Sequence, residues 1–148
     1  MTQEDKELLF KDLSSRLPYG VKCWASYNKF PTTLVDVNAD TVGDNLFVVT
    51  VKLKKTGLNS PSLIEDIKPY LRPMSSMTDE QKKYIVDRWG INEEFDFEIN
   101  PDWGEYFIEL GDIVDFIDWL NKNHFDYRGL IEKGLAIEAP KDMYKNQQ

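Results

Sequence analysis

The sequence predicts one α+β domain that covers residues 1–148. Three observations lead to this fold class. Apolar residues recur at helical spacing near the N-terminus, they alternate with polar residues in several later runs, and 41% of the chain is hydrophobic. A chain of this length and composition can bury a core. The expected order is an N-terminal helix, a small antiparallel sheet that could be barrel-like, a central helix, an acidic hairpin and C-terminal helices.

The first element is expected to be a helix that begins after Thr2. The Thr2 side chain can cap the helix, with Asp5 three residues later. Pro18 ends it, because proline cannot continue a helix. The apolar positions at helical spacing are Leu9, Phe10, Leu13 and Leu17.

Three strand-like runs follow: "VKCWAS" at 21–26, "TTLVDV" at 32–37 and "NLFVVTVKL" at 45–53. Their alternation and their β-branched residues predict an antiparallel sheet. Prolines then recur between residues 56 and 76, which predicts irregular chain with one short helical turn around "SLIEDI".

The second half is expected to contain more helix. Thr78 and Gln81 form a capping-box signature, and Gly90 can close that helix. Alternating residues on both sides of "NPDWG" predict a hairpin over residues 93–110. "GDIVDFIDWLNKN" predicts a helix, and "DYRGLIEKG" predicts a second, short one capped by Asp126. The tail, residues 140–148, is expected to be flexible. The alternative organisation divides a β-rich part, 18–55, from a helix-rich part, 78–135.

Charge is distributed unevenly along the chain, whose net charge is −8. Residues 61–148 hold 10 basic and 19 acidic side chains, and no basic residue lies between Arg88 and Lys122. Such a surface repels phosphate backbones, so nucleic-acid binding through this half is disfavoured. The sequence contains no apolar run of membrane-spanning length, and its first residues lack the pattern of a secretory signal. We therefore expect a cytoplasmic protein that does not associate with membranes.

The residue types that usually carry chemistry are sparse. Cys23 is the only cysteine and is expected to be buried, and His124 is the only histidine and is expected to be structural. The spacing of Glu98, Asn100, Asp102 and Glu109 matches part of a calcium loop, but Trp103 stands where the loop needs glycine. The acids of the hairpin alternate with apolar residues, so we interpret them as solvated. We expect no catalytic residue, no metal site and no cofactor.

Three segments carry a resemblance: "LPYGVKC" at 17–23, "IKPYLRPMSSMTDEQKK" at 67–83 and "NHFDYRGLIEKGLAIEAPKDMY" at 123–144. In these segments the chain resembles a family of small uncharacterised proteins encoded by phages, prophages and related mobile elements of gut anaerobic bacteria. The resemblance implies an origin in a mobile element and a place of action in the cytoplasm of the bacterial host. It implies no activity and no catalytic residues.

The leading functional hypothesis is a non-enzymatic accessory protein that binds a protein partner with a basic surface. The expected interaction surface consists of Glu94, Asp96, Glu98, Asp102, Trp103, Glu105 and Glu109. An acidic mimic of nucleic acid, acting against host defence, is a narrower version of this hypothesis.

The alternative is a nucleic-acid-binding module built from residues 18–55. Its backbone contacts would come from Lys22, Lys29, Lys52, Lys54 and Lys55, with Trp24 or Tyr27 stacked on a base. An enzyme that uses buried acids around His124 is a third hypothesis.

Overall fold

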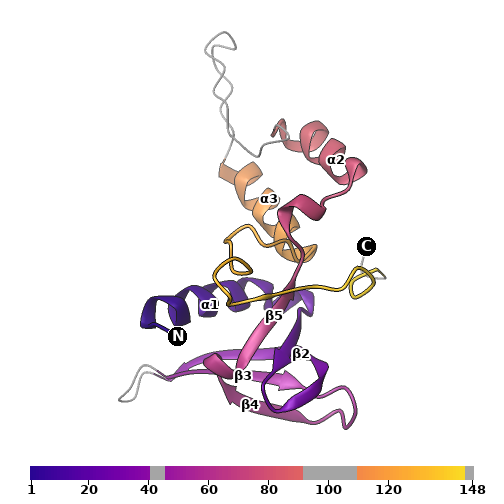
Figure 1. Cartoon of the computed structure of the whole chain (residues 1–148). Coiled ribbons are helices and arrows are strands. Elements are labelled where there is room, and N and C mark those ends of the chain that lie inside the picture. Colours follow the sequence, from indigo (N-terminus) through magenta and orange to yellow (C-terminus); the bar gives the residue numbers. More distant parts are fainter. Residues whose placement is uncertain (41–45, 92–109, 146–148) are drawn as a thin grey trace.

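The structure is a computed structural model that describes residues 1–40, 46–91 and 110–145. Within these ranges the helices are α1 (Gln3–Arg16), α2 (Asp79–Trp89) and α3 (Leu110–Lys122). The strands are β1 (Lys22–Ala25), β2 (Asn28–Asp40), β3 (Leu46–Lys52), β4 (Asn59–Leu63), β5 (Ile67–Leu71) and β6 (Ile137–Glu138). Single-turn helices are η1 (Leu17–Tyr19), η2 (Ile64–Asp66) and η3 (Met74–Ser76). The predicted α+β class is confirmed. Figure 1 shows α1 along the layer of strands, and β5 leading from that layer towards α2 and α3.

The strands form one sheet in the order β4-β3-β2-β1-β5-β6. Neighbouring strands are antiparallel except β5 and β6, which are parallel, so the sheet is mixed. The three-residue η2 carries the chain from β4 at one edge to β5, which pairs with β1. This short connection requires the sheet to curl. No ladder joins β4 to β5 within the described ranges, so the expected barrel-like form is wrong.

Two strands lie where the prolines predicted irregular chain. Pro61 is in β4, opposite Thr50, and Pro69 is in β5, opposite Cys23. A proline is tolerated where one side of a strand is unpaired, because its missing N–H then costs no ladder bond. β4 is an edge strand, and β6 pairs with β5 only at Tyr70 and Leu71.

Side chains of β1 alternate between the two faces of the sheet. Cys23 and Ala25 of β1 are buried, whereas Lys22 and Trp24 lie on the other face and are partly exposed. The buried face packs with Leu9 and Leu13 of α1, which the predicted helical stripe contains. The sheet residues of this core are Val21, Cys23, Ala25, Leu34, Val49, Val51, Ile67 and Leu71.

A second, smaller core joins α2 and α3. Its buried residues are Met77, Ile85, Ile91, Phe116, Leu120 and Phe125. α2 begins with the capping box of Thr78 and Gln81, and Gly90 follows it in the left-handed conformation with φ 65°. No helix in the described ranges is long and apolar enough to cross a membrane. The hairpin predicted over residues 93–110 falls almost entirely outside these ranges.

The second C-terminal helix predicted from Asp126 is absent, and a series of turns takes its place. The Asp126 carboxylate accepts hydrogen bonds from the backbone N–H groups of Leu130 (2.8 Å) and Ile131 (2.9 Å). Gly134 closes the turns with φ 72°. The sequence signals of a helix cap and a helix end were present, but the segment between them is too short to stabilise a helix.

A buried ion pair ties α1 to the C-terminal part of the chain. The Arg16 guanidinium donates to both carboxylate oxygens of Asp12, at 2.8 and 3.0 Å, and neither side chain is exposed. Arg16 also donates to the backbone oxygen of Phe125 at 2.7 Å, and Arg128 approaches Asp12 at 3.5 Å. Because the pair is bidentate and buried, loss of one partner would leave an uncompensated charge.

Replacing Asp12 with Asn should lower the free energy of unfolding by about 3–5 kcal/mol, because Arg16 stays charged and buried. Urea denaturation followed by circular dichroism measures the change. Asp142→Asn is the matched control, since it removes an exposed pair with Lys145 and should cost less than about 1 kcal/mol. Equal unfolding midpoints for Asp12→Asn and the unaltered protein would contradict the role of the ion pair.

Candidate functional site

The residues of the predicted acidic interaction surface lie outside the described residues. They are Glu94, Asp96, Glu98, Asp102, Trp103, Glu105 and Glu109. Binding through this surface therefore stays a prediction. The calcium pattern over residues 98–109 lies outside them as well.

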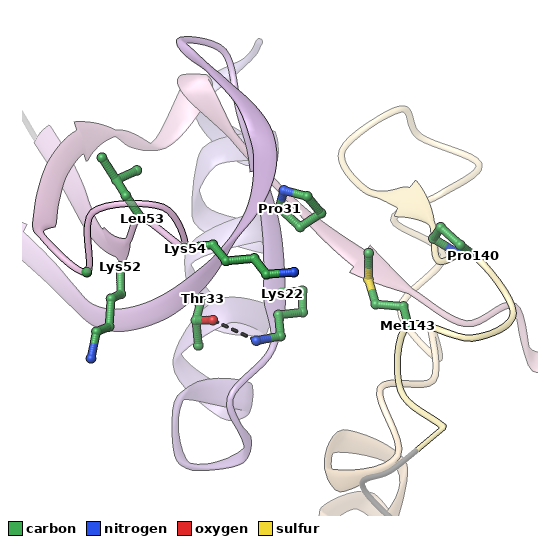
Figure 2. Close-up of a pocket in the computed structure, with 9 residues that line it drawn as sticks. Lys22, Pro31, Thr33, Lys52, Leu53, Lys54, Pro140 and Met143 are labelled. Carbon is green, nitrogen blue, oxygen red and sulfur yellow. Dashed lines mark hydrogen bonds between the residues drawn. The ribbon is translucent and has the colours of Figure 1, made fainter.

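The structure contains a cleft of about 420 Å³ beside β1, β2 and the end of β3. Figure 2 shows the side chains that line it, which come from the sheet, from the loop after β3 and from the C-terminal turn. They are Lys22, Pro31, Thr33, Lys52, Leu53, Lys54, Gly57, Pro140 and Met143. Three of the nine are lysines, and none is acidic.

Strand register brings the lysines of the sheet to one row. Lys22 of β1 lies opposite Thr33 of β2, and Thr33 lies opposite Lys52 of β3. Residues that oppose each other across a ladder point to the same face, so this row lies on the face away from the core. The Lys22 ammonium donates to the Thr33 hydroxyl at 2.8 Å, which fixes the position of its charge (Figure 2).

A tight loop between β3 and β4 presents the third lysine, Lys54. The Gly57 N–H donates to the Leu53 oxygen at 2.8 Å, and the Leu53 N–H donates to the Leu58 oxygen at 2.9 Å. Gly57 has φ 70°, a conformation that side-chain-bearing residues rarely adopt. The loop is thus held by its own backbone, with its lysine directed to the cleft (Figure 2).

The far wall of the cleft is the C-terminal turn, and the Tyr144 hydroxyl helps to hold it against the sheet. The Tyr144 hydroxyl donates to the Tyr70 oxygen at 2.8 Å and accepts from the Lys22 N–H at 3.0 Å, so it bridges β5 and β1. The Tyr144 ring stacks on His124 with centroids 3.9 Å apart. Pro140 and Met143 are positioned by this anchor.

The cleft is suited to an anion. Among the described residues, no carboxylate lies within ion-pair distance of Lys22, Lys52 or Lys54. The Lys22 and Lys54 side chains extend towards the same space in Figure 2, whereas the Lys52 ammonium points away from them. An anion bound near Lys22 and Lys54 would offset their positive charge. Pro31, Leu53 and Met143 supply apolar surface for the body of a ligand.

The other candidate groups are Cys23 and His124, and both lie in the interior. Cys23 is buried, as predicted, and burial with the nearby Asp12 raises the pKa of its thiol, which makes it unreactive. His124 is also buried. No cluster of three or more His, Cys, Asp or Glu side chains suited to a metal occurs in the part of the chain that the structure describes.

Only some of the lysines named in the nucleic-acid hypothesis line the cleft. Lys29 and Lys55 do not line the cleft. The Tyr27 hydroxyl lies 2.6 Å from Ser62 Oγ in β4, away from the Lys22 row. Sequence reasoning did not find Pro140 or Met143, because no local signal shows that the tail returns to β1.

The chain matches no protein-family model, no curated protein and no solved structure. The resemblance to mobile-element proteins therefore stays a prediction.

Replacing Tyr144 with Phe should lower the free energy of unfolding by about 1–3 kcal/mol, because the partly buried Lys22 N–H and Tyr70 oxygen lose their partner. Chemical denaturation at pH 7 measures this loss. Tyr84→Phe is the control, since it alters an exposed tyrosine of α2. A midpoint for Tyr144→Phe equal to that of Tyr84→Phe would contradict the anchoring role.

The stability of Tyr144→Phe should also depend on pH differently from that of the unaltered protein. Burial raises the pKa of Tyr144 above its ordinary value of 10.0, so the folded state keeps a proton that the unfolded chain releases. This contribution to stability is complete below pH 10 and is lost as the pH rises towards the folded pKa. The unaltered protein should therefore lose more stability than Tyr144→Phe between pH 8 and 11. Identical losses in the two proteins would refute a buried, protonated hydroxyl.

Proposed function

We propose that the protein binds a phosphate-bearing ligand in the lysine-lined cleft, and that its role is binding and not catalysis. One observation carries the proposal: Lys22, Lys52 and Lys54 come from separate parts of the sheet and its loop and line one cleft, and no carboxylate of the described residues pairs with them. The net charge of −8 makes this local excess of positive charge unusual for the chain.

The chemistry of the cleft favours phosphate over a simple carboxylate. Lysine ammonium groups act as point charges and bind the oxygens of phosphate from several directions. A phosphate carries more negative charge than a carboxylate, so it offsets more of the positive charge of the lysines that line the cleft. The Thr33 hydroxyl orients Lys22, and the apolar walls accept a carbon framework.

Inorganic pyrophosphate is the simplest probe of this proposal. Isothermal titration calorimetry should detect its binding to the unaltered protein, and the double variant Lys52→Gln/Lys54→Gln should bind at least about tenfold more weakly, because two charge-assisted contacts are lost. Lys82→Gln/Lys83→Gln is the matched control, since it removes the same charge from α2 and should retain affinity.

The absence of heat with the unaltered protein, or equal affinity in the two double variants, would overturn the proposal. Circular dichroism of each variant confirms that the fold is intact before the titration.

A second candidate function is binding of a protein partner with a basic surface. It is favoured by the ten acidic residues between Arg88 and Lys122, where the sequence has no basic residue. Two of them, Asp115 and Asp118, are exposed on α3. An acidic surface of this kind speeds association with a basic partner and depends on ionic strength.

Charge reversal tests this second function. The variant Glu94→Lys/Asp96→Lys/Glu98→Lys should lose a basic protein partner that the unaltered protein captures from a bacterial lysate at low salt, as identified by mass spectrometry. Glu4→Lys/Glu7→Lys/Glu132→Lys is the control, because it reverses three exposed acids elsewhere and should keep the partner. Capture by all three proteins alike would remove the acidic surface from consideration.

A further inference from the structure

We infer that the ligand of the cleft is a single-stranded nucleic acid, which continues from the cleft across β1 and β5 with a base stacked on Trp24. This inference rests on the proposed function and names the ligand of the same site. It is carried by the arrangement of lysine and aromatic side chains on the outer face of the sheet.

The outer face continues beyond the cleft as a strip of basic and aromatic residues. In β1, Lys22 and Trp24 share this face because Cys23 and Ala25 point into the core. In β5, the buried positions are Ile67, Pro69 and Leu71, so Lys68 and Tyr70 point outward. Trp24 lies directly opposite Lys68 in the β1–β5 ladder. We call Trp24, Lys68 and Tyr70 the aromatic strip.

The aromatic strip begins next to the lysines of the cleft. Lys22 and Trp24 are two residues apart on one strand, which separates their backbones by about 7 Å. A phosphate held by Lys22 would therefore have an aromatic ring within reach of the adjoining nucleotide. Bases stack on aromatic side chains regardless of sequence, and lysines beside them hold the backbone.

Trp24 is not needed as a core residue. The two buried clusters of the described chain contain neither Trp24 nor Lys68 nor Tyr70, and all three side chains are partly exposed. A tryptophan on the outer face of a sheet leaves apolar area in contact with water, which a stacked base would remove.

The charges on this face indicate the path that the bound nucleic acid takes across the sheet. Asp36 lies opposite Thr50, in the neighbouring row of β2 and β3 and on the same face as Lys52. A phosphate backbone is repelled there, whereas Lys68 attracts it on the side of β5. The path therefore leads from Lys52 and Lys54 past Lys22 to Trp24 and Lys68.

A single strand fits this face better than the alternatives. A duplex hides its bases in the stack, so Trp24 would find no exposed base plane. A mononucleotide in the cleft would leave Lys68 unused. Affinity that grows with the length of an unpaired strand therefore distinguishes a nucleic acid from a small phosphorylated molecule.

Fluorescence anisotropy with labelled oligothymidylates of two to ten nucleotides tests the inference. Affinity should rise with length, and its logarithm should fall with the logarithm of salt concentration at a slope of about −3, as four lysine–phosphate contacts predict. A duplex of ten base pairs should bind more weakly. Pyrophosphate should compete, since it shares the cleft.

Three substitutions locate the bound nucleic-acid strand on the aromatic strip. Trp24→Ala should bind the ten-nucleotide strand about 5- to 100-fold more weakly, whereas Trp24→Phe keeps a stacking ring and should recover most of the affinity. Lys68→Gln should reduce the salt slope by about 0.7. None of the three changes should alter the affinity for pyrophosphate, and Lys83→Gln on α2 is the control for the charge.

The outcomes distinguish this inference from the proposed phosphate site on which it rests. Pyrophosphate binding without any gain in affinity from two to ten nucleotides would overturn the single-strand inference and leave the anion site standing. Oligonucleotide binding that Trp24→Ala and Lys68→Gln do not weaken would overturn the path across β1 and β5. Failure of both pyrophosphate and oligonucleotides to bind would remove the site altogether.

Discussion

The alternation of side chains along β1 and β5 is the constraint on which the site depends. Cys23 and Ala25 must point inward to meet Leu9 and Leu13 of α1, because these side chains form the main core. Successive side chains of a strand point to opposite faces, so Lys22 points outward. The same alternation in β3 buries Val51 and turns the next residue, Lys52, to the outer face. The packing of the core thus places positive charges on the opposite surface.

The C-terminal part of the chain turns this face into a cleft. Tyr144 inserts its hydroxyl between Lys22 and Tyr70, where it completes hydrogen bonds that β1 and β5 do not make with each other. Further along, Arg16 holds Asp12 and the Phe125 oxygen together in the interior. The Lys22–Tyr144 and Arg16–Phe125 hydrogen bonds each link residues more than a hundred positions apart. The site and the tertiary structure are therefore coupled, and a change that frees the C-terminal turn would also open the cleft.

Local signals predicted the elements with strong periodicity or caps. The capping boxes at Thr2 and Thr78 mark the starts of α1 and α2, and the alternation around Cys23 predicts β1 and its burial. The sequence did not predict β4 and β5, because proline usually disfavours a strand. Pro61 and Pro69 are tolerated where one side of the strand is unpaired, and the order of strands in the whole sheet decides where that is. The lysines were identifiable as a basic set, but strand register selects Lys22 and Lys52 from it, and the loop after β3 adds Lys54. The tail that completes the cleft is positioned by distant contacts, which no local pattern reveals.

Amide chemical shifts of the isotope-labelled protein during titration with inorganic pyrophosphate test the central claim most directly. The account predicts that the largest shifts fall on Lys22, Thr33, residues 52–57 and Met143, because these surround the cleft. The amides of α2 and α3 should stay unchanged, since both helices pack in the other core. Shifts confined to α2 and α3, or no residue-specific shift at all, would contradict a ligand site on the outer face of the sheet.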